Sequence, residues 1–265
     1  MSDVVILSPS RFSLNTLCAT ELLLRNQVQV KAIVVRRLIN PRRFVKEFGR
    51  DGTRLIRKIW KKLVLRDSAY KHRDYETIVD FMKAEGMVFR TVDELAKKHG
   101  IPVVYCYDLN VPVVVDTLKK AAPDLVVFTG GGLIRAEVLQ HCGAGIANCH
   151  MGILPRYRGM DVVEWPVLED RLDQVGTTVH FMDQGIDTGD ILQKRKVSTQ
   201  SVATFKELRD RFERCMCEQF VETCLDYLNG RVERVPQAPE DGKQYFLMHP
   251  RLLQIAQAKL KAAAE

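Results

Sequence analysis

The chain is organised around Asn148-Cys149-His150 and the segment that follows it, Ile153-Leu154-Pro155-Arg156-Tyr157-Arg158-Gly159. Apolar runs typical of buried strands lie on both sides, at residues 125–128 and 176–182. Side chains two positions apart on a strand point to the same face, so we expect Asn148 and His150 to project together and Cys149 to point away. An amide and an imidazole are thus predicted to lie together at the end of a strand.

The N-terminal part of the chain predicts a parallel sheet. Residues 4–8 and 30–35 have the composition of buried strands, and the apolar periodicity between them predicts a helix over residues 14–25. This β-α-β order is typical of α/β proteins. We therefore expect an α/β fold with a Rossmann-like, mostly parallel sheet and helices on both faces. Further helices are predicted at residues 74–83, 92–99 and 113–122, and further strands at 101–105 and 125–128.

The rest of the chain predicts a smaller extension. Apolar spacing predicts a long helix over residues 201–228, then a short strand segment, and a terminal helix over residues 250–264. We expect a catalytic domain at residues 1–200 with a basic helical insertion at about 36–90. Residues 201–265 would form the C-terminal extension.

Composition is that of an ordinary globular protein, with 46% apolar and 28% charged residues among 265. No apolar run reaches the ~18 residues that a membrane-spanning helix needs, and residues 1–4 lack the basic flank of a signal peptide. A cytoplasmic location is expected. The seven cysteines lack the spacing of a zinc site, so we expect reduced, mostly buried thiols and no metal.

One segment makes the chain basic. Residues 36–66 hold 12 Lys and Arg against two acidic residues, an excess of 10, which leaves the rest at about −3 of the total +7. Phe44, Phe48, Leu55, Ile59 and Leu63 recur at helical spacing within it. The segment is compatible with a helix packed on the core by its apolar stripe. The alternatives are a clamp for a phosphorylated acceptor, contact with a membrane surface, or a less favoured contact with nucleic acid.

Four motifs in the second half of the chain occur in a fixed order. They are Asn148-x-His150, Leu154-Pro155-x-Tyr157-Arg158-Gly159, Val179-His180-x-Met182 and Ile186-Asp187-Thr188-Gly189. In this order they resemble the folate-dependent formyltransferases, which include glycinamide ribonucleotide, methionyl-tRNA and sugar N-formyltransferases. The resemblance is clear over residues 123–197 and weaker over residues 4–35. It implies a one-carbon transferase that moves a formyl group from N10-formyltetrahydrofolate to an amine.

The resemblance implies three catalytic residues, Asn148, His150 and Asp187. An uncharged N–H donor such as Asn148 can stabilise an oxyanion by ~3 kcal/mol. An imidazole such as His150 can move protons near neutral pH, and Asp187 would orient it or accept the proton of the attacking amine. The alternative is that all three are structural, with Asn148 as a turn residue, His150 as a buried imidazole and Asp187 in an Asx turn. His180 is expected to be structural.

The resemblance also implies two sets of binding residues. The folate would be held by the loop after residues 125–128 and by a second loop, through Gly130, Gly131, Gly132, Leu133, Ile134, Met182, Asp183 and Gly185. The acceptor would be held by Ser8, Ser10, Arg11, Tyr157, Arg158 and Gly159. Many family members carry Pro-Ser after the histidine, whereas this chain has Met151-Gly152, a change that is expected to affect acceptor fit or rate.

The acceptor expected from the resemblance is a small-molecule amine, either an amino sugar nucleotide or a specialised metabolite. The first alternative is a formyltetrahydrofolate hydrolase, in which water replaces the amine. A second is an enzyme like methionyl-tRNA formyltransferase without its C-terminal barrel, and a third is a basic binding module without turnover. The sequence leaves the oligomeric state open and is compatible with a homodimer.

Overall fold

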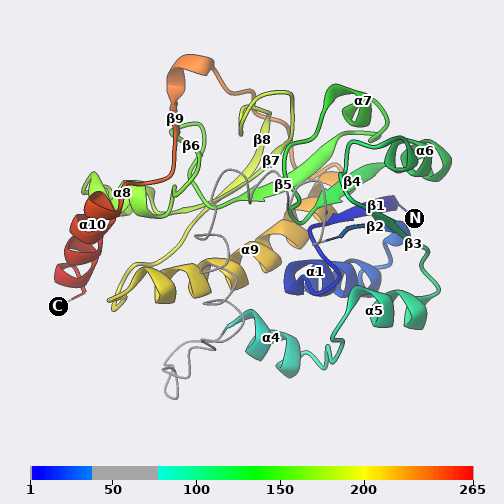
Figure 1. Ribbon diagram of the computed structural model, residues 1–265, viewed down its shortest axis with the longest axis horizontal. Helices are drawn as coiled ribbons and strands as arrows, with labels where there is room; N and C mark the ends of the chain where they lie inside the picture. The colour runs from blue at the N-terminus through cyan, green and yellow to red at the C-terminus, as the bar shows by residue number, and fades with distance from the viewer. Residues whose placement is uncertain (1, 38–76, 265) are drawn as a thin grey trace, which may run out of the picture.

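The centre of the fold is a mostly parallel sheet. A computed structural model describes residues 2–37 and 77–264, and within them seven strands pair in the order β3-β2-β1-β4-β5-β7-β8 (Figure 1). The first five of these strands run parallel, while β7 is antiparallel to both β5 and β8. The bounds are β1 Asp3–Ser8, β2 Gln29–Arg36, β3 Val103–Cys106, β4 Leu125–Phe128, β5 Ile146–His150, β7 Gly176–Phe181 and β8 Ile191–Lys196.

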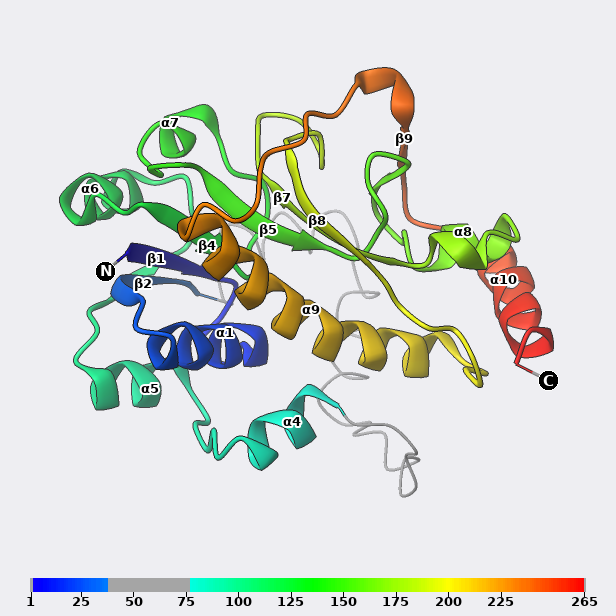
Figure 2. The ribbon, with the colours of Figure 1, turned by 180° about the vertical axis from the view of Figure 1, so that it is seen from behind.

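Helices cover both faces of this sheet, so the α/β, Rossmann-like prediction is confirmed. One face packs against α1 (Leu14–Arg25), α4 (Ile78–Ala84), α5 (Val92–His99) and α9 (Phe205–Leu228). The other face packs against α6 (Pro112–Ala121) and α7 (Ala136–Leu139), and Figures 1 and 2 show the two layers from opposite sides. Because the central strands are covered on both faces, Val4, Ile6 and Val126 are fully buried.

A smaller unit lies at the end of the molecule far from the N-terminus (Figure 1). It contains α8 (Glu164–Leu168), α10 (Pro250–Ala262) and a short parallel sheet of β6 (Tyr157–Gly159) with β9 (Lys243–Tyr245). Short 3-10 turns, η1 (Leu172–Gln174) and η2 (Pro239–Asp241), precede β7 and β9. The sequence predicted a strand near β9 but not its partner β6, and this pairing brings the C-terminal extension against residues 157–159.

Local sequence accounts for the ends of the principal helices. Thr204 and Glu207 form a capping box that starts α9, each side chain bonding the other residue's backbone N–H. The hydroxyl of Ser13 caps α1 by accepting from the N–H of Thr16. Gly100, with a φ of +67°, ends α5 in the left-handed conformation. These signals fix the helices that flank the sheet.

The strand order reverses between β1 and β4, which lie side by side although β2 and β3 separate them in sequence. In open α/β sheets such a switch point, at the carboxyl ends of the strands, is where ligands bind. The loops after β1, β4 and β5 all open at this end of the sheet. The predicted basic segment, residues 36–66, falls almost entirely outside the described residues. Over the described ranges no helix is both long and apolar enough to cross a membrane.

Candidate active site

Two neighbouring strands bring the first polar side chains together. Asn148 and His150 lie at the end of β5, and the antiparallel register places Asn148 directly opposite His180 of β7. The amide nitrogen Nδ2 of Asn148 lies 3.1 Å from Nε2 of His180. The predicted pair on β5 is thus joined by a third polar residue from β7.

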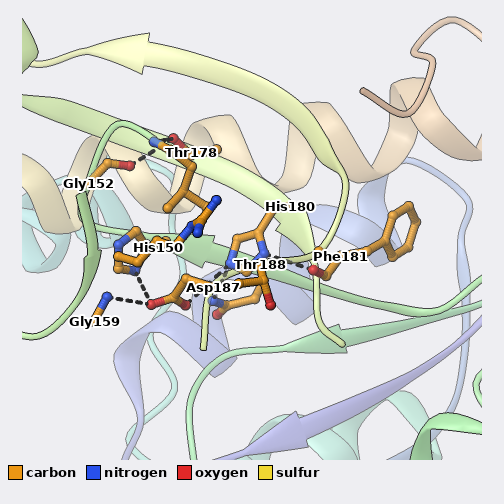
Figure 3. A network of polar contacts seen from close by, with 12 residues as sticks. His150, Gly152, Gly159, Thr178, His180, Phe181, Asp187 and Thr188 are labelled. Carbon is orange, nitrogen blue, oxygen red and sulfur yellow. Dashed lines mark hydrogen bonds and ion pairs between the residues drawn. The ribbon is translucent and has the colours of Figure 1, made fainter. Parts of the chain in front are cut away.

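Asp187 lies between two imidazoles, as Figure 3 shows. Its Oδ2 is 3.5 Å from Nδ1 of His150, and its Oδ1 is 3.6 Å from Nε2 of His180. The N–H of Gly159 donates to Oδ2 at 2.9 Å. Asp187 has a φ of +55°, a left-handed conformation that Asp tolerates better than most residues. The loop after β7 therefore presents this carboxylate to the end of β5.

His180 is neutral at physiological pH and orients the Asn148 amide. Burial and the neighbouring His150 lower the pKa of His180 to about 4. Its Nδ1–H donates to the carbonyl of Phe181 at 2.8 Å, so Nε2 carries the lone pair. The Asn148 atom that lies 3.1 Å from this lone pair must be a hydrogen-bond donor, which fixes Nδ2 on this side. The sequence alone does not predict this contact of His180, because strand register cannot be read from one strand alone.

A tight loop holds the ring of His150 from the other side. Nε2 of His150 donates to the carbonyl of Tyr157 at 2.9 Å, and the residue is 8% exposed. A Cβ added to Gly152 would lie 2.9 Å from that Nε2 and 2.7 Å from the Tyr157 carbonyl, so a glycine is needed here. Thr178 fixes the same loop by donating to the Gly152 carbonyl at 2.7 Å.

Cys149 points to the opposite side of β5, as expected. It is buried, and burial raises the pKa of its thiol well above the usual value. Such a thiol is a poor nucleophile. Among the described residues, no three His, Cys, Asp or Glu side chains are grouped as metal ligands would be.

The residues predicted to shape the acceptor mouth divide between two places. Tyr157 is fully buried and its hydroxyl donates to Glu169, so its side chain does not reach the mouth. Arg158 is 5% exposed, and its Nη2 donates to the Ala238 carbonyl at 3.0 Å. Both positions correct the prediction, since the β6–β9 pairing turns these side chains inward. Gly159 does line the groove beside Asn148 and His150.

The loop after β1 also differs from the expectation. The hydroxyl of Ser8 is buried, donates to the Ser10 carbonyl at 2.9 Å and lies 2.7 Å from the hydroxyl of Thr16. Arg11 lies 3.2 Å from Asp93. Ser10 accepts from a backbone N–H two residues on, at 3.3 Å. Ser8 is thus too buried to reach an acceptor, which corrects its predicted role, whereas acceptor contacts of Ser10 and Arg11 stay predictions.

The predicted folate residues gather around one cavity. A space of about 850 Å³ is lined by seven of the eight, namely Gly131, Gly132, Leu133, Ile134, Met182, Asp183 and Gly185. Gly131 has a φ of +140°, and a Cβ there would lie 2.6 Å from Leu109, so only glycine fits. Gly130 lies against Pro9 instead and lines a neighbouring pocket.

Two further spaces meet at Asn148. A groove of about 320 Å³ is lined by His150, Gly159, Met160 and Arg209 on one side of it. Arg209 of α9 is held in the groove wall by Glu164, which is 4% exposed and accepts two bonds from Nη2 at 2.7 and 2.8 Å. A pocket of about 220 Å³ lies between Asn148 and the helices α1 and α9. The polar cluster thus borders several cavities.

A comparison with protein families shows which family the chain resembles. Residues 93–224, about half of the chain, match the family described as Formyl transferase. The chain belongs to the formyl transferase family. The family resemblance predicted from the sequence is therefore confirmed. The matched residues include the strands and the loop that hold Asn148, His150 and Asp187.

Several formyltransferases are similar to this chain. It is 36% identical over 148 residues to "Methionyl-tRNA formyltransferase" from Geotalea daltonii, a match covering 55% of this chain and 47% of the relative. The chain thus spans about half the length of the curated relatives it matches. A sugar N-formyltransferase structure from Shewanella has a TM-score of 0.58 at 13% identity, covering 98% of this chain and 88% of that one. A formyltransferase structure from Anoxybacillus kamchatkensis, in complex with a UDP-linked formamido sugar and tetrahydrofolate, has a TM-score of 0.50 at 22% identity, covering 66% and 94%.

Two residues that the sequence did not single out line the large cavity. The side chain of Asn110 donates to the Leu133 carbonyl at 2.9 Å and accepts from the N–H of Arg135 at 2.6 Å. Arg36 donates to the Gly131 carbonyl. Both clamp the glycine-rich loop from neighbouring segments. An Asn after a short strand is too common to be recognised from sequence.

Proposed function

We propose that this chain is a formyltransferase that moves a formyl group from N10-formyltetrahydrofolate to an amine. The observation that carries the proposal is the meeting of Asn148, His150 and Asp187 at the end of β5, close to a cavity lined by the predicted folate residues. An amide donor, an imidazole and a carboxylate are the groups that acyl transfer to an amine requires.

The large cavity has the size and lining that a reduced folate needs. Ligand pockets for molecules of this class measure roughly 300–1,000 Å³, and this one measures about 850 Å³. The glycines that line it expose backbone N–H and carbonyl groups, and Asp183 and Met182 line it as well. The folate, when bound there, supplies the formyl group. The tetrahydrofolate in the related Anoxybacillus structure supports this assignment.

Asn148 would stabilise the negative charge that develops on the formyl oxygen when the amine attacks. One proton of its Nδ2 is directed to His180, which leaves the second available to an oxygen in the groove. Because His180 is buried and neutral, the amide is held before the substrate arrives. A preorganised donor of this kind contributes ~3 kcal/mol to a transition state.

His150 and Asp187 would handle the protons. The amine gains a bond to the formyl carbon and must lose a proton, while the departing nitrogen must gain one. Nδ1 of His150 faces Asp187 at 3.5 Å, and Nε2 is already bonded to the Tyr157 carbonyl. Nδ1 and the carboxylate are therefore the atoms placed to take up the proton and return it.

The acceptor expected from the sequence was an amino sugar nucleotide or a specialised metabolite. The loop after β1 was expected to hold the acceptor, yet Ser8 bonds to Thr16 and Arg11 pairs with Asp93. Arg158, which was also expected to hold the acceptor, donates to the Ala238 carbonyl. These contacts favour the second class, a specialised amine, as the proposed acceptor.

The test is a product analysis. Purified protein is incubated with N10-formyltetrahydrofolate labelled in the formyl carbon, with and without a panel of amines that includes an amino sugar nucleotide and charged methionyl-tRNA. The proposal expects label in a formamide, and label released only as formate would show a hydrolase instead. No release of label from a folate that binds would contradict both activities.

A further inference from the structure

The smaller pocket behind Asn148 is mostly apolar, and its polar lining residues are Asn15, Thr129 and Asn148. It measures about 220 Å³, and its walls include Ala19 of α1, Phe128 of β4 and three residues of α9, namely Met216, Cys217 and Phe220. We call this space the apolar pocket. None of the described residues that line it carries a charge.

The apolar pocket lies next to the groove that contains the reacting groups. Asn148, Cys149 and Met151 line both the apolar pocket and the groove that contains His150 and Gly159. An amine placed against Asn148 therefore lies beside both spaces. The folate cavity is lined by a different set of residues, so the two spaces do not compete for one ligand.

We propose that the acceptor is an amine with an uncharged, apolar arm, and that the apolar pocket holds this arm. The proposal rests on the proposed formyl transfer and names its substrate class. A phosphate or carboxylate would have to be buried there without a charged partner, at a large cost in free energy. An apolar cavity of about 150 Å³ accommodates benzene, so one of about 220 Å³ takes a branched aliphatic chain or a single ring.

The methionines of the apolar pocket agree with such an arm. Met151 and Met216 are half-buried, and methionine side chains are flexible enough to close around apolar groups of different shape. Met151 lines both the groove and the apolar pocket, so an adaptable apolar side chain lies between the reacting groups and the pocket.

Two matched amines test the proposal. L-Leucinamide and L-asparaginamide have side chains of nearly equal size but opposite polarity. We expect kcat/KM for formamide formation to be about 10- to 100-fold higher for leucinamide, the range that an apolar specificity pocket provides. Equal values for the two amides would overturn the proposal while leaving formyl transfer intact.

Two variants change the size of the pocket in opposite directions. Ala19→Met fills part of it and is expected to reduce the preference for leucinamide at least tenfold, whereas the same change at exposed Ala263 is the control. Phe220→Leu enlarges it and is expected to shift preference from leucinamide to L-phenylalaninamide. Unchanged preferences in both folded variants would contradict the assignment.

Binding separates this proposal from the proposed function. Calorimetry measures both amides on the protein, with and without 5-formyltetrahydrofolate as a stable folate probe. If the folate does not bind, the proposed function fails, and tighter binding of leucinamide than asparaginamide still supports the pocket. If the folate binds and the two amides bind equally or not at all, the pocket assignment is wrong.

Discussion

Nδ1 of His150 lies 3.5 Å from Oδ2 of Asp187, while Nε2 of the same ring donates to the Tyr157 carbonyl at 2.9 Å. Because Nε2 holds a proton for that bond, a neutral ring turns the lone pair of Nδ1 towards the carboxylate. A proton added at Nδ1 converts this contact into an attraction. The arrangement is therefore suited to store the proton that an attacking amine gives up.

Gly152 tests the importance of the His150 position. We expect Gly152→Ala to reduce formyl transfer by ~10²-fold, because the added Cβ would displace the His150 ring or the Tyr157 carbonyl. Crowding of this buried loop is also expected to lower the free energy of unfolding by ~1–3 kcal/mol. Initial rates and denaturant unfolding curves measure the two effects.

Gly100→Ala is the control for stability alone. Gly100 has open space around its Cβ position and a φ of +67°, so alanine there costs ~1 kcal/mol without reaching the site. Equal loss of rate in the two variants would show that general destabilisation, and not the position of His150, causes the effect.

His180 predicts a dependence of stability on pH. Its pKa is lowered from 6.5 to about 4 in the folded protein, so the unfolded chain binds the proton more readily. The contribution of neutral His180 to the free energy of unfolding is fully present above pH 6.5. It falls by a total of ~3 kcal/mol as the pH falls from there to about 4. Unfolding free energies measured at intervals from about pH 7.5 down to about pH 4 reveal this slope.

His180→Gln isolates that effect, since glutamine does not titrate in this range. We expect the variant to be less stable than the wild type at neutral pH and to lack the His180 part of the pH slope. Parallel curves for the two proteins would mean that other groups cause the acid sensitivity.

Asn110 is expected to affect folate binding without affecting the chemical step. Asn110→Ala removes the bonds to Leu133 and Arg135 that hold the glycine-rich loop, and each is worth ~1 kcal/mol. We expect KM for the folate to rise ~10-fold at unchanged kcat. Asn229→Ala, which removes a comparable bond at the end of α9, should leave KM unchanged. A fall in kcat with an unchanged KM for the folate would contradict the assignment of Asn110 to folate binding.

Local signals were enough to predict most of the fold. The apolar runs at residues 4–8 and 125–128 are short and contain no polar residue within their centres, and they form β1 and β4 as expected. The helix over residues 14–25 was predicted from its apolar spacing and coincides with α1, which the Ser13 side chain caps. β6 was missed because three residues, two of them polar or glycine, carry no strand signal without their partner β9.

The sequence predicted which polar residues lie together at the end of β5, but not which residues surround them. Asn148, His150 and Asp187 were found because family motifs mark them, and the structure places them together. His180 could not be assigned to the cluster, since its contact depends on the β5–β7 register. The inward turn of Tyr157 and Arg158 depends on contacts with distant segments of the chain, as for the bond of Arg158 to the Ala238 carbonyl.

The central claim is that Asn148 of β5 and Asp187 of the loop after β7 act on the same formyl group. Its most direct test is the single-turnover rate of formyl transfer in Asn148→Ala and Asp187→Asn, with exposed Asp173→Asn as the control and 5-formyltetrahydrofolate binding as the check on folding. We expect both variants to bind the folate and to lose ~10²–10⁴-fold in rate. Full rates in either variant would contradict the claim.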